Sequence, residues 1–134
     1  MDRAVFALTR GRTNLSILLA GFPEVIVTTI GAKSGQPRTL PLVYIQDDAA
    51  PRAFALIASN FGQRHNPAWY YNLIAHPTAT CTIDGQTGEY SAREATGAEY
   101  NKFWQAAVDT YFGYALYKQR ASHRHIPIMI MTPA

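Results

Sequence analysis

The chain lacks most of the features that fix a fold or a reaction covalently. It has a single cysteine, Cys81, so no disulfide can form within it. It also lacks an apolar run near the ~20 residues that a membrane-spanning helix needs. The longest apolar run near the N-terminus, Ile17–Phe22, ends at Pro23. With 134 residues, the chain is expected to form one cytoplasmic domain over residues 1–134.

Motifs for catalysis and metal binding are missing as well. No Gly-x-Ser-x-Gly, His-Glu-x-x-His or Cys-x-x-Cys segment occurs. His123 and His125 would share one face of a strand, but the sequence suggests no third ligand beside them. We therefore expect no metal site. An enzyme of this composition would take its reactivity from an organic cofactor.

Positive charge is concentrated at the N-terminal end. Residues 1–38 carry five cations and two anions, whereas the rest of the chain carries seven of each, which leaves a net charge of +3. This bias suits an anionic ligand. Because no dense run of lysine and arginine occurs, a small-molecule anion is expected as the partner and nucleic acid is not.

Apolar periodicity and turn signals predict a mainly β protein of the α+β type. Strands are expected at Val25–Ile30, Leu40–Gln46, Phe54–Ser59, Thr78–Ile83, Thr87–Glu94 and Pro127–Thr132. Helices are expected at Ala68–Ala75, from Thr96 to about Thr110, and at Tyr114–Ser122. This order favours an antiparallel barrel of about six strands with peripheral helices.

Residues 1–22 are expected to form an N-terminal helical segment. Two placements stay open for this segment, packing on the domain or peripheral contact with a membrane surface. Because an unpaired barrel edge allows self-association, both a monomer and a homodimer stay open.

The loop between the first two strands combines two glycines, Gly31 and Gly35, with two cations, Lys33 and Arg38. Glycines allow positive φ and let backbone N–H groups converge, and the cations would neutralise an anion held there. The alternative is an ordinary hairpin loop with solvated cations. A Walker A loop is excluded, because Ala32 precedes the lysine and a strand follows.

Two aromatic groups favour a ligand pocket, although such groups also occur in cores. The segment Asn66–Leu73 places three rings at the start of a helix, with Asn66 expected as its N-cap. Tyr111, Tyr114 and Tyr117 recur every three residues, so they would lie on about a third of a helix circumference. A buried tyrosine hydroxyl needs a partner and can donate to a ligand.

In this order and spacing, the segments resemble the deazaflavin-dependent nitroreductase family. Its members are small split-barrel proteins that bind the reduced deazaflavin coenzyme F420. The likeness runs from Val25 to the C-terminus, through Val27–Gly35, Arg38–Leu42, Ala58–Gly62, Asn66–Leu73, Tyr111–Tyr117 and Arg124–Pro127. The resemblance implies a split antiparallel β-barrel that binds F420.

The resemblance also implies roles for individual residues. Lys33 and Arg38 would hold the coenzyme phosphate and the start of its anionic tail, in a loop shaped by Ser34, Gly35, Thr39 and Pro41. The deazaflavin side would be lined by Ser59, Asn60, Gly62, Asn66, Pro67, Ala68 and Trp69. The substrate pocket would be formed by Tyr111, Tyr114 and Tyr117, where a hydroxyl orients the electrophile or donates a proton.

The chain departs from the family pattern at three positions. Phe61 stands where the family usually has glycine, and Asn66 and Tyr71 stand where it commonly has histidine. The expected activity is hydride transfer from reduced F420 to a small electron-poor acceptor, such as a quinone, an enone or a nitro compound. The alternatives are a non-catalytic deazaflavin or flavin carrier, and a split-barrel reductase that uses FMN.

Overall fold

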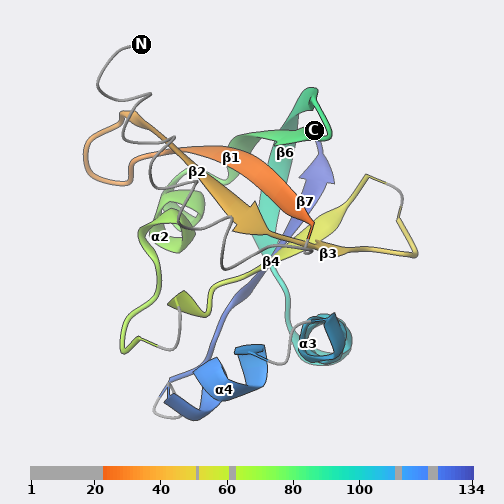
Figure 1. Cartoon of the computed structure of the whole chain (residues 1–134). Helices are drawn as coiled ribbons and strands as arrows, with labels where there is room; N and C mark the ends of the chain where they lie inside the picture. Colours follow the sequence, from red (N-terminus) through yellow and green to blue (C-terminus); the bar gives the residue numbers. More distant parts are fainter. Residues whose placement is uncertain (1–22, 51, 61–62, 111–112, 121–123) are drawn as a thin grey trace.

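The computed structural model describes residues 23–50, 52–60, 63–110, 113–120 and 124–134 (Figure 1). The expected N-terminal helical segment and its membrane contact therefore lie outside the described residues, as do Gly62, Tyr111 and His123. Within the described ranges, no helix is long and apolar enough to cross a membrane.

One curled antiparallel sheet of seven strands forms the body of the molecule (Figure 1). Its strands are β1 (Glu24–Ile30), β2 (Pro37–Val43), β3 (Ile45–Gln46), β4 (Phe54–Ile57), β5 (Thr78–Ile83), β6 (Gln86–Glu94) and β7 (Ile128–Pro133). They lie in the order β2-β1-β5-β6-β7-β4-β3. The predicted antiparallel barrel architecture is confirmed, with one strand more than expected.

The additional strand arises at Tyr44, where the apolar run expected as one strand divides. β2 pairs with β1, whereas β3, which begins directly after Tyr44, pairs with β4. β2 and β3 are the two edges of the sheet, yet a single residue separates them in the chain. The sheet must therefore curl until its edges approach, which gives the split barrel its shape.

Two apolar cores occupy opposite faces of β4 and β7. Phe54 and Leu56 face the barrel interior, while Ala55 and Ile57 belong to a second core. Such alternation follows from the two-residue period of a strand and explains why all four residues of β4 are buried. In β7, Met129 and Met131 likewise lie in the barrel core.

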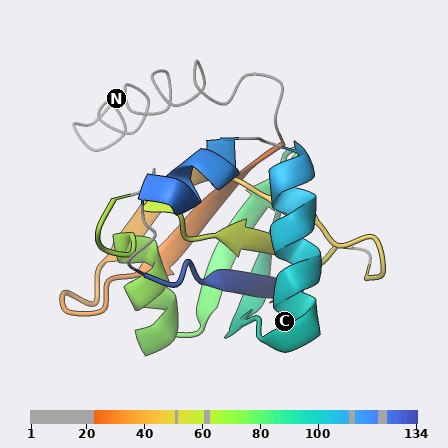
Figure 2. The same cartoon turned by 90° about the horizontal axis from the view of Figure 1, so that it is seen from below.

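In the described part of the chain, three helices cover the sheet. α2 (Ala68–Ala75) packs on β1 and closes the barrel core with Trp69 and Leu73. α3 (Gly97–Thr110) and α4 (Gly113–Arg120) cover the second core. Figure 2 shows α2 and α3 on opposite sides of the sheet, so the two cores are separated by strands.

The β5–β6 hairpin contains a left-handed turn and a buried cysteine. Asp84 and Gly85 have φ of 51° and 79°, the left-handed conformations that a two-residue hairpin turn requires. Cys81 in β5 is buried opposite Val27 of β1. Burial raises the pKa of its thiol to about 12, as expected of a structural rather than a nucleophilic cysteine.

Candidate functional site

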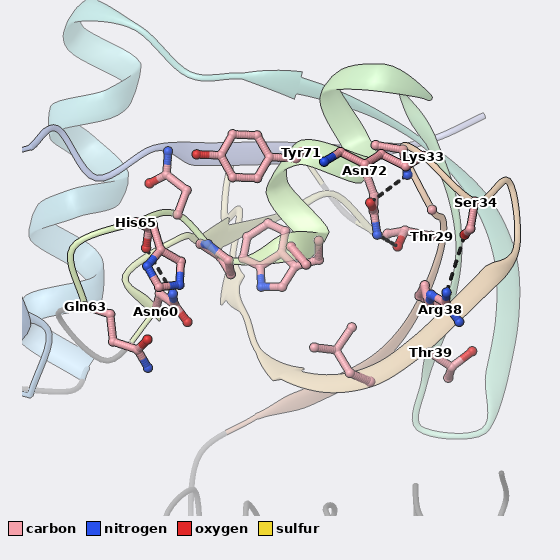
Figure 3. A pocket seen from close by; sticks show the side chains of 17 residues that line it. Thr29, Lys33, Ser34, Arg38, Thr39, Asn60, Gln63, His65, Tyr71 and Asn72 are labelled. Carbon is pink, nitrogen blue, oxygen red and sulfur yellow. Dashed lines mark hydrogen bonds between the residues drawn. The ribbon is translucent and has the colours of Figure 1, made fainter.

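A cleft of about 1080 Å³ lies between the β1–β2 loop, the start of α2 and the loop from β4 to α2 (Figure 3). Of the residues predicted to bind a cofactor, it gathers Lys33, Ser34, Arg38, Thr39, Asn60, Asn66, Pro67, Ala68 and Trp69. It also includes residues absent from that prediction: Thr29, Gly31, Ala32, Leu40, Gln63, His65, Tyr71 and Asn72.

The β1–β2 loop has a tight backbone that depends on its two glycines. The Gly31 N–H donates to the Gln36 carbonyl at 2.8 Å, and the Gly35 N–H donates to the Gly31 carbonyl at 2.9 Å. A Cβ at Gly31 would meet Ser34 Oγ at 2.4 Å. Gly35 has φ of +70°, which favours glycine. Another residue at Gly31 would require the loop to shift, and another residue at Gly35 would strain the backbone.

The loop presents its charge through side chains. Lys33 and Arg38 are exposed, both line the cleft, and neither forms an ion pair within the described part of the chain. The Ser34 hydroxyl lies between them in sequence and accepts from the Gln36 N–H at 3.2 Å. Arg38 Nη2 lies 3.4 Å from the same hydroxyl. This end of the cleft is therefore positively charged and open to an anion.

The expected convergence of backbone N–H groups is only partly available in this loop. The N–H groups of Gly31, Ala32, Gly35 and Gln36 all donate to oxygen atoms of the protein itself. Those hydrogen bonds close the turn and anchor it to α2, so these four donors are not free for a ligand. An anion would be held mainly by the Lys33 and Arg38 side chains.

Asn72 connects α2 to this loop. Its Oδ1 accepts from the Ala32 N–H at 2.9 Å, and its Nδ2 donates to Thr29 Oγ1 at 3.0 Å. Both Asn72 and Thr29 are buried. Asn72 lies within the Asn66–Leu73 segment, but no individual role was predicted for it. A polar residue on the buried side of a short apolar helix is the signal that points to such a link.

The start of α2 differs from the expectation. Pro67, with φ of −68° and ψ of 155°, is the N-cap residue, and no side chain caps the helix. The expected Asn66 cap is therefore wrong. Its Oδ1 accepts from Arg124 Nη1 instead, because that guanidinium lies beside it. Pro67, Ala68 and Trp69 all line the cleft, as predicted.

Asn60, Gln63 and His65 form the other end of the cleft, away from Lys33, Ser34 and Arg38 (Figure 3). Asn60 has φ of 49°, a left-handed conformation that asparagine tolerates better than most residues. Its Nδ2 donates to the His65 carbonyl at 3.0 Å. Gln63 and His65 were not predicted, since isolated polar residues in a loop carry no pattern in the sequence.

Three predicted cofactor residues lie apart from the cleft lining. Gly35 is exposed with open space around its Cα, Pro41 is buried in β2, and Ser59 is only 6% exposed. Ser59 nevertheless contributes its backbone, because its carbonyl accepts from Arg124 Nη2 at 2.8 Å. Gly62, also predicted, lies outside the described residues.

The tyrosines expected in the substrate pocket are placed differently. Tyr114 is 6% exposed and belongs to the second core, where α4 packs on the sheet, so it does not line this cleft. Tyr111 and the side chain of Tyr117 are outside the described part. Tyr71, 49% exposed, is the tyrosine that the described residues bring to the cleft.

Known proteins similar to this chain include F420-dependent reductases. A family model described as F420H(2)-dependent quinone reductase matches residues 3–133. A Mycobacterium tuberculosis protein named F420H(2)-dependent quinone reductase is 31% identical over 132 residues, which cover 96% of this chain and 85% of the relative.

Two solved structures are similar in fold and sequence. One, described as an F420-H2 dependent reductase (FDR-A), has a TM-score of 0.73 and 35% identity, covering 82% of this chain and 94% of the other. A second, described as a domain-swapped dimer, has a TM-score of 0.73 and 33% identity, covering 92% of this chain and 96% of the other. These similarities confirm the predicted split-barrel fold.

Proposed function

This chain belongs to the F420H(2)-dependent quinone reductase family, and on that premise we propose that its cleft holds the coenzyme phosphate at Lys33 and Arg38. The protein is an F420H2-dependent reductase that transfers hydride to quinone-type acceptors, as the resemblance predicts. The family supports F420 rather than the FMN alternative. The carrier alternative is set aside, because the relatives are named as reductases.

The observation that carries this proposal is a pair of cations at one end of the cleft, neither of which has an ion-pair partner among the described residues. Lys33 and Arg38 come from opposite sides of one tight turn, and their charges attract a phosphate group. Arginine offers a planar pair of donors, whereas lysine offers a compact point charge, so the two hold different oxygen atoms. The Ser34 hydroxyl would provide a further hydrogen bond.

The middle and far end of the cleft fit a planar ring with polar edges. Leu40, Pro67, Ala68 and Trp69 give an apolar lining, and the polar side chains of Asn60, Gln63 and His65 lie beyond them. Small-molecule sites commonly measure about 300–1,000 Å³. At about 1080 Å³, the cleft has room for the ring and for part of an acceptor.

The bound reduced coenzyme would supply the hydride, so no nucleophile of the protein is required. The residues of the chain would hold the ring and the acceptor in register. A tyrosine hydroxyl would donate the accompanying proton. Tyr71 has the exposure for this role, and Tyr117 on α4 stays a candidate from the sequence.

The assembly of this chain has two alternatives, monomer and homodimer. A structural neighbour at 33% identity is described as a domain-swapped dimer, which supports the homodimer. Light scattering during size-exclusion chromatography distinguishes them, because it measures the molar mass of the particle and the protomer mass is 14.9 kDa. A mass near that of one protomer at all concentrations would reject the homodimer.

The direct test is a titration of the purified protein with reduced F420, with FMN as the competing ligand. We expect reduced F420 to bind and FMN at equal concentration to leave that binding unchanged. Adding a soluble quinone to the complex should then oxidise the coenzyme, followed by its absorbance. Tight binding of FMN with no response to F420 would contradict the proposal.

A further inference from the structure

Arg124, just before β7, contacts both arms of the loop that joins β4 to α2. Its Nη2 donates to the Ser59 carbonyl at 2.8 Å, and its Nε donates to the Gln63 carbonyl at 3.0 Å. Its Nη1 donates to Asn66 Oδ1. Ser59 lies on the arm that leaves β4, whereas Gln63 and Asn66 lie on the arm that enters α2. One side chain thus fixes the separation of the two arms.

These contacts take the place of a counter-charge. No carboxylate of the described residues forms an ion pair with Arg124. Burial lowers the pKa of its guanidinium, because the charged group loses hydration. Oxygen atoms of carbonyl and amide groups surround it instead, and hydrogen bonds of this kind depend strongly on direction.

The base of the side chain is itself anchored to rigid elements. The Arg124 carbonyl accepts from Lys118 Nζ of α4 at 3.0 Å. The Ala58 N–H donates to the Pro127 carbonyl at 2.9 Å, which joins the first arm to the segment entering β7. The guanidinium therefore reaches the loop from a fixed position.

The same two arms form the far end of the cleft. Asn60 belongs to the first arm, and Gln63 and His65 belong to the second (Figure 3). The peptide bond between Ser59 and Asn60 is trans, so its C=O and N–H groups point in opposite directions. Because the Ser59 carbonyl points toward Arg124, the Asn60 N–H points away from the guanidinium. Arg124 thereby sets the backbone orientation at a residue that lines the cleft.

We propose that Arg124 is a positioning residue for the coenzyme ring, a role that rests on the proposed function. Its planar guanidinium holds the two arms at the separation at which Asn60, Gln63 and His65 meet the ring. Lysine has the same charge but only one nitrogen, so it cannot reach the three acceptors in their three directions. Shape, and not charge alone, is the property required here.

The test compares Arg124→Lys and Arg124→Gln with the wild-type protein. Arg93→Lys and Arg93→Gln are the matched controls, because Arg93 pairs with Glu99 away from the cleft. Both Arg124 variants should raise the Kd for reduced F420 by about tenfold or more, because the apparent affinity falls by the fraction of molecules whose loop keeps the binding arrangement. In the ligand-free protein, hydrogen exchange at residues 58–60 and 63–66 should become faster, while the Arg93 variants change neither quantity.

A second readout separates this role from general destabilisation. Inorganic phosphate is used as a competitor that needs only the Lys33–Arg38 end. Its inhibition constant should stay unchanged in the Arg124 variants while the KM for the coenzyme rises. Wild-type coenzyme affinity in Arg124→Lys would overturn the proposal, since charge would then suffice. Equal loss of phosphate and coenzyme binding would overturn it too.

The two proposals fail in different ways. If wild-type protein does not bind reduced F420, the proposed function is contradicted, whatever the Arg124 variants do. If wild-type protein binds and exchange at residues 58–60 and 63–66 is unchanged in both Arg124 variants, the positioning role is contradicted and the proposed function stands.

Discussion

Asn72 of α2 donates a hydrogen bond to Thr29 of β1 at 3.0 Å, with both side chains buried. The same amide accepts from the Ala32 N–H in the loop that follows β1. A single side chain therefore couples three parts of the molecule: the helix that lines the cleft, the strand beneath it and the cationic loop. The position of Lys33 depends on this link, since Lys33 directly follows the bonded residue.

Asn72→Ala should lower both stability and coenzyme affinity. The substitution leaves Thr29 Oγ1 and the Ala32 N–H without this partner, and an unmet buried polar group costs about 1–3 kcal/mol. We expect the free energy of unfolding in urea to fall by about 2 kcal/mol. Gln105→Ala on the exposed face of α3 is the control, because its contact with Asp109 is local. An unchanged urea midpoint for Asn72→Ala would contradict the link.

Arg38→Gln tests the anion end directly. A hydrogen bond to a charged group contributes about 1.5–3 kcal/mol, so coenzyme affinity should fall about ten- to hundredfold. The loss should shrink at high salt, because the cleft is open and its charges are screened. Arg52→Gln, an exposed change in the β3–β4 turn, is the control. Equal affinities in a folded Arg38→Gln protein would remove the phosphate site.

The sequence predicts a helix or strand well where apolar periodicity and terminating residues lie within the segment itself. The bounds of α2 and β5 agree with the prediction. The break at Tyr44 was not predictable, because the apolar run continues across it and only pairing with different strands separates β2 from β3. Local signals describe strands but not their partners.

The candidate site likewise contains residues that local motifs predict and contacts between distant segments that they do not. Lys33, Arg38 and the Pro67–Trp69 segment were predicted from local motifs together with the family resemblance that those motifs carry, and the cleft contains them. The contact of Arg124 with Ser59 spans 65 positions, so no local pattern reveals it. The tyrosine triplet has helical spacing, but spacing does not say which face of α4 meets the sheet, and Tyr114 points into the second core.

The two glycines of the β1–β2 loop should respond differently to alanine. At Gly31 a Cβ would meet Ser34 Oγ at 2.4 Å and the Gln36 carbonyl at 3.3 Å, so the cationic loop must shift. At Gly35 the space is open, and the cost is backbone strain of about 1 kcal/mol at φ of +70°. Gly31→Ala should therefore weaken coenzyme binding more than Gly35→Ala, measured by titration. The reverse order would show that the loop adapts.

Tyrosine-to-phenylalanine changes separate the cleft from the core. Tyr71→Phe removes the hydroxyl of a tyrosine that lines the cleft, so turnover of the quinone should fall while the Kd for the coenzyme changes little. Tyr114→Phe keeps the ring that packs in the second core, so both quantities should stay near the wild-type values. Steady-state kcat and coenzyme titration measure the two effects. Lower kcat in Tyr114→Phe alone would support the catalytic role predicted for Tyr111, Tyr114 and Tyr117.

The thiol of Cys81 should make stability depend on alkaline pH. Burial raises its pKa from 9.0 to about 12, so the unfolded chain ionises this group before the folded protein does. The stabilisation is fully present below pH 9.0 and is lost as pH rises toward about 12.

Tyr70 adds to this loss of stability above its ordinary pKa of 10.0, because burial and a hydrogen bond to Glu94 raise its pKa to about 12. Cys81→Ala should therefore show a shallower loss of unfolding free energy between pH 9 and pH 10, measured in urea. The same slope in both proteins would mean that the thiol ionises equally in the folded and unfolded states.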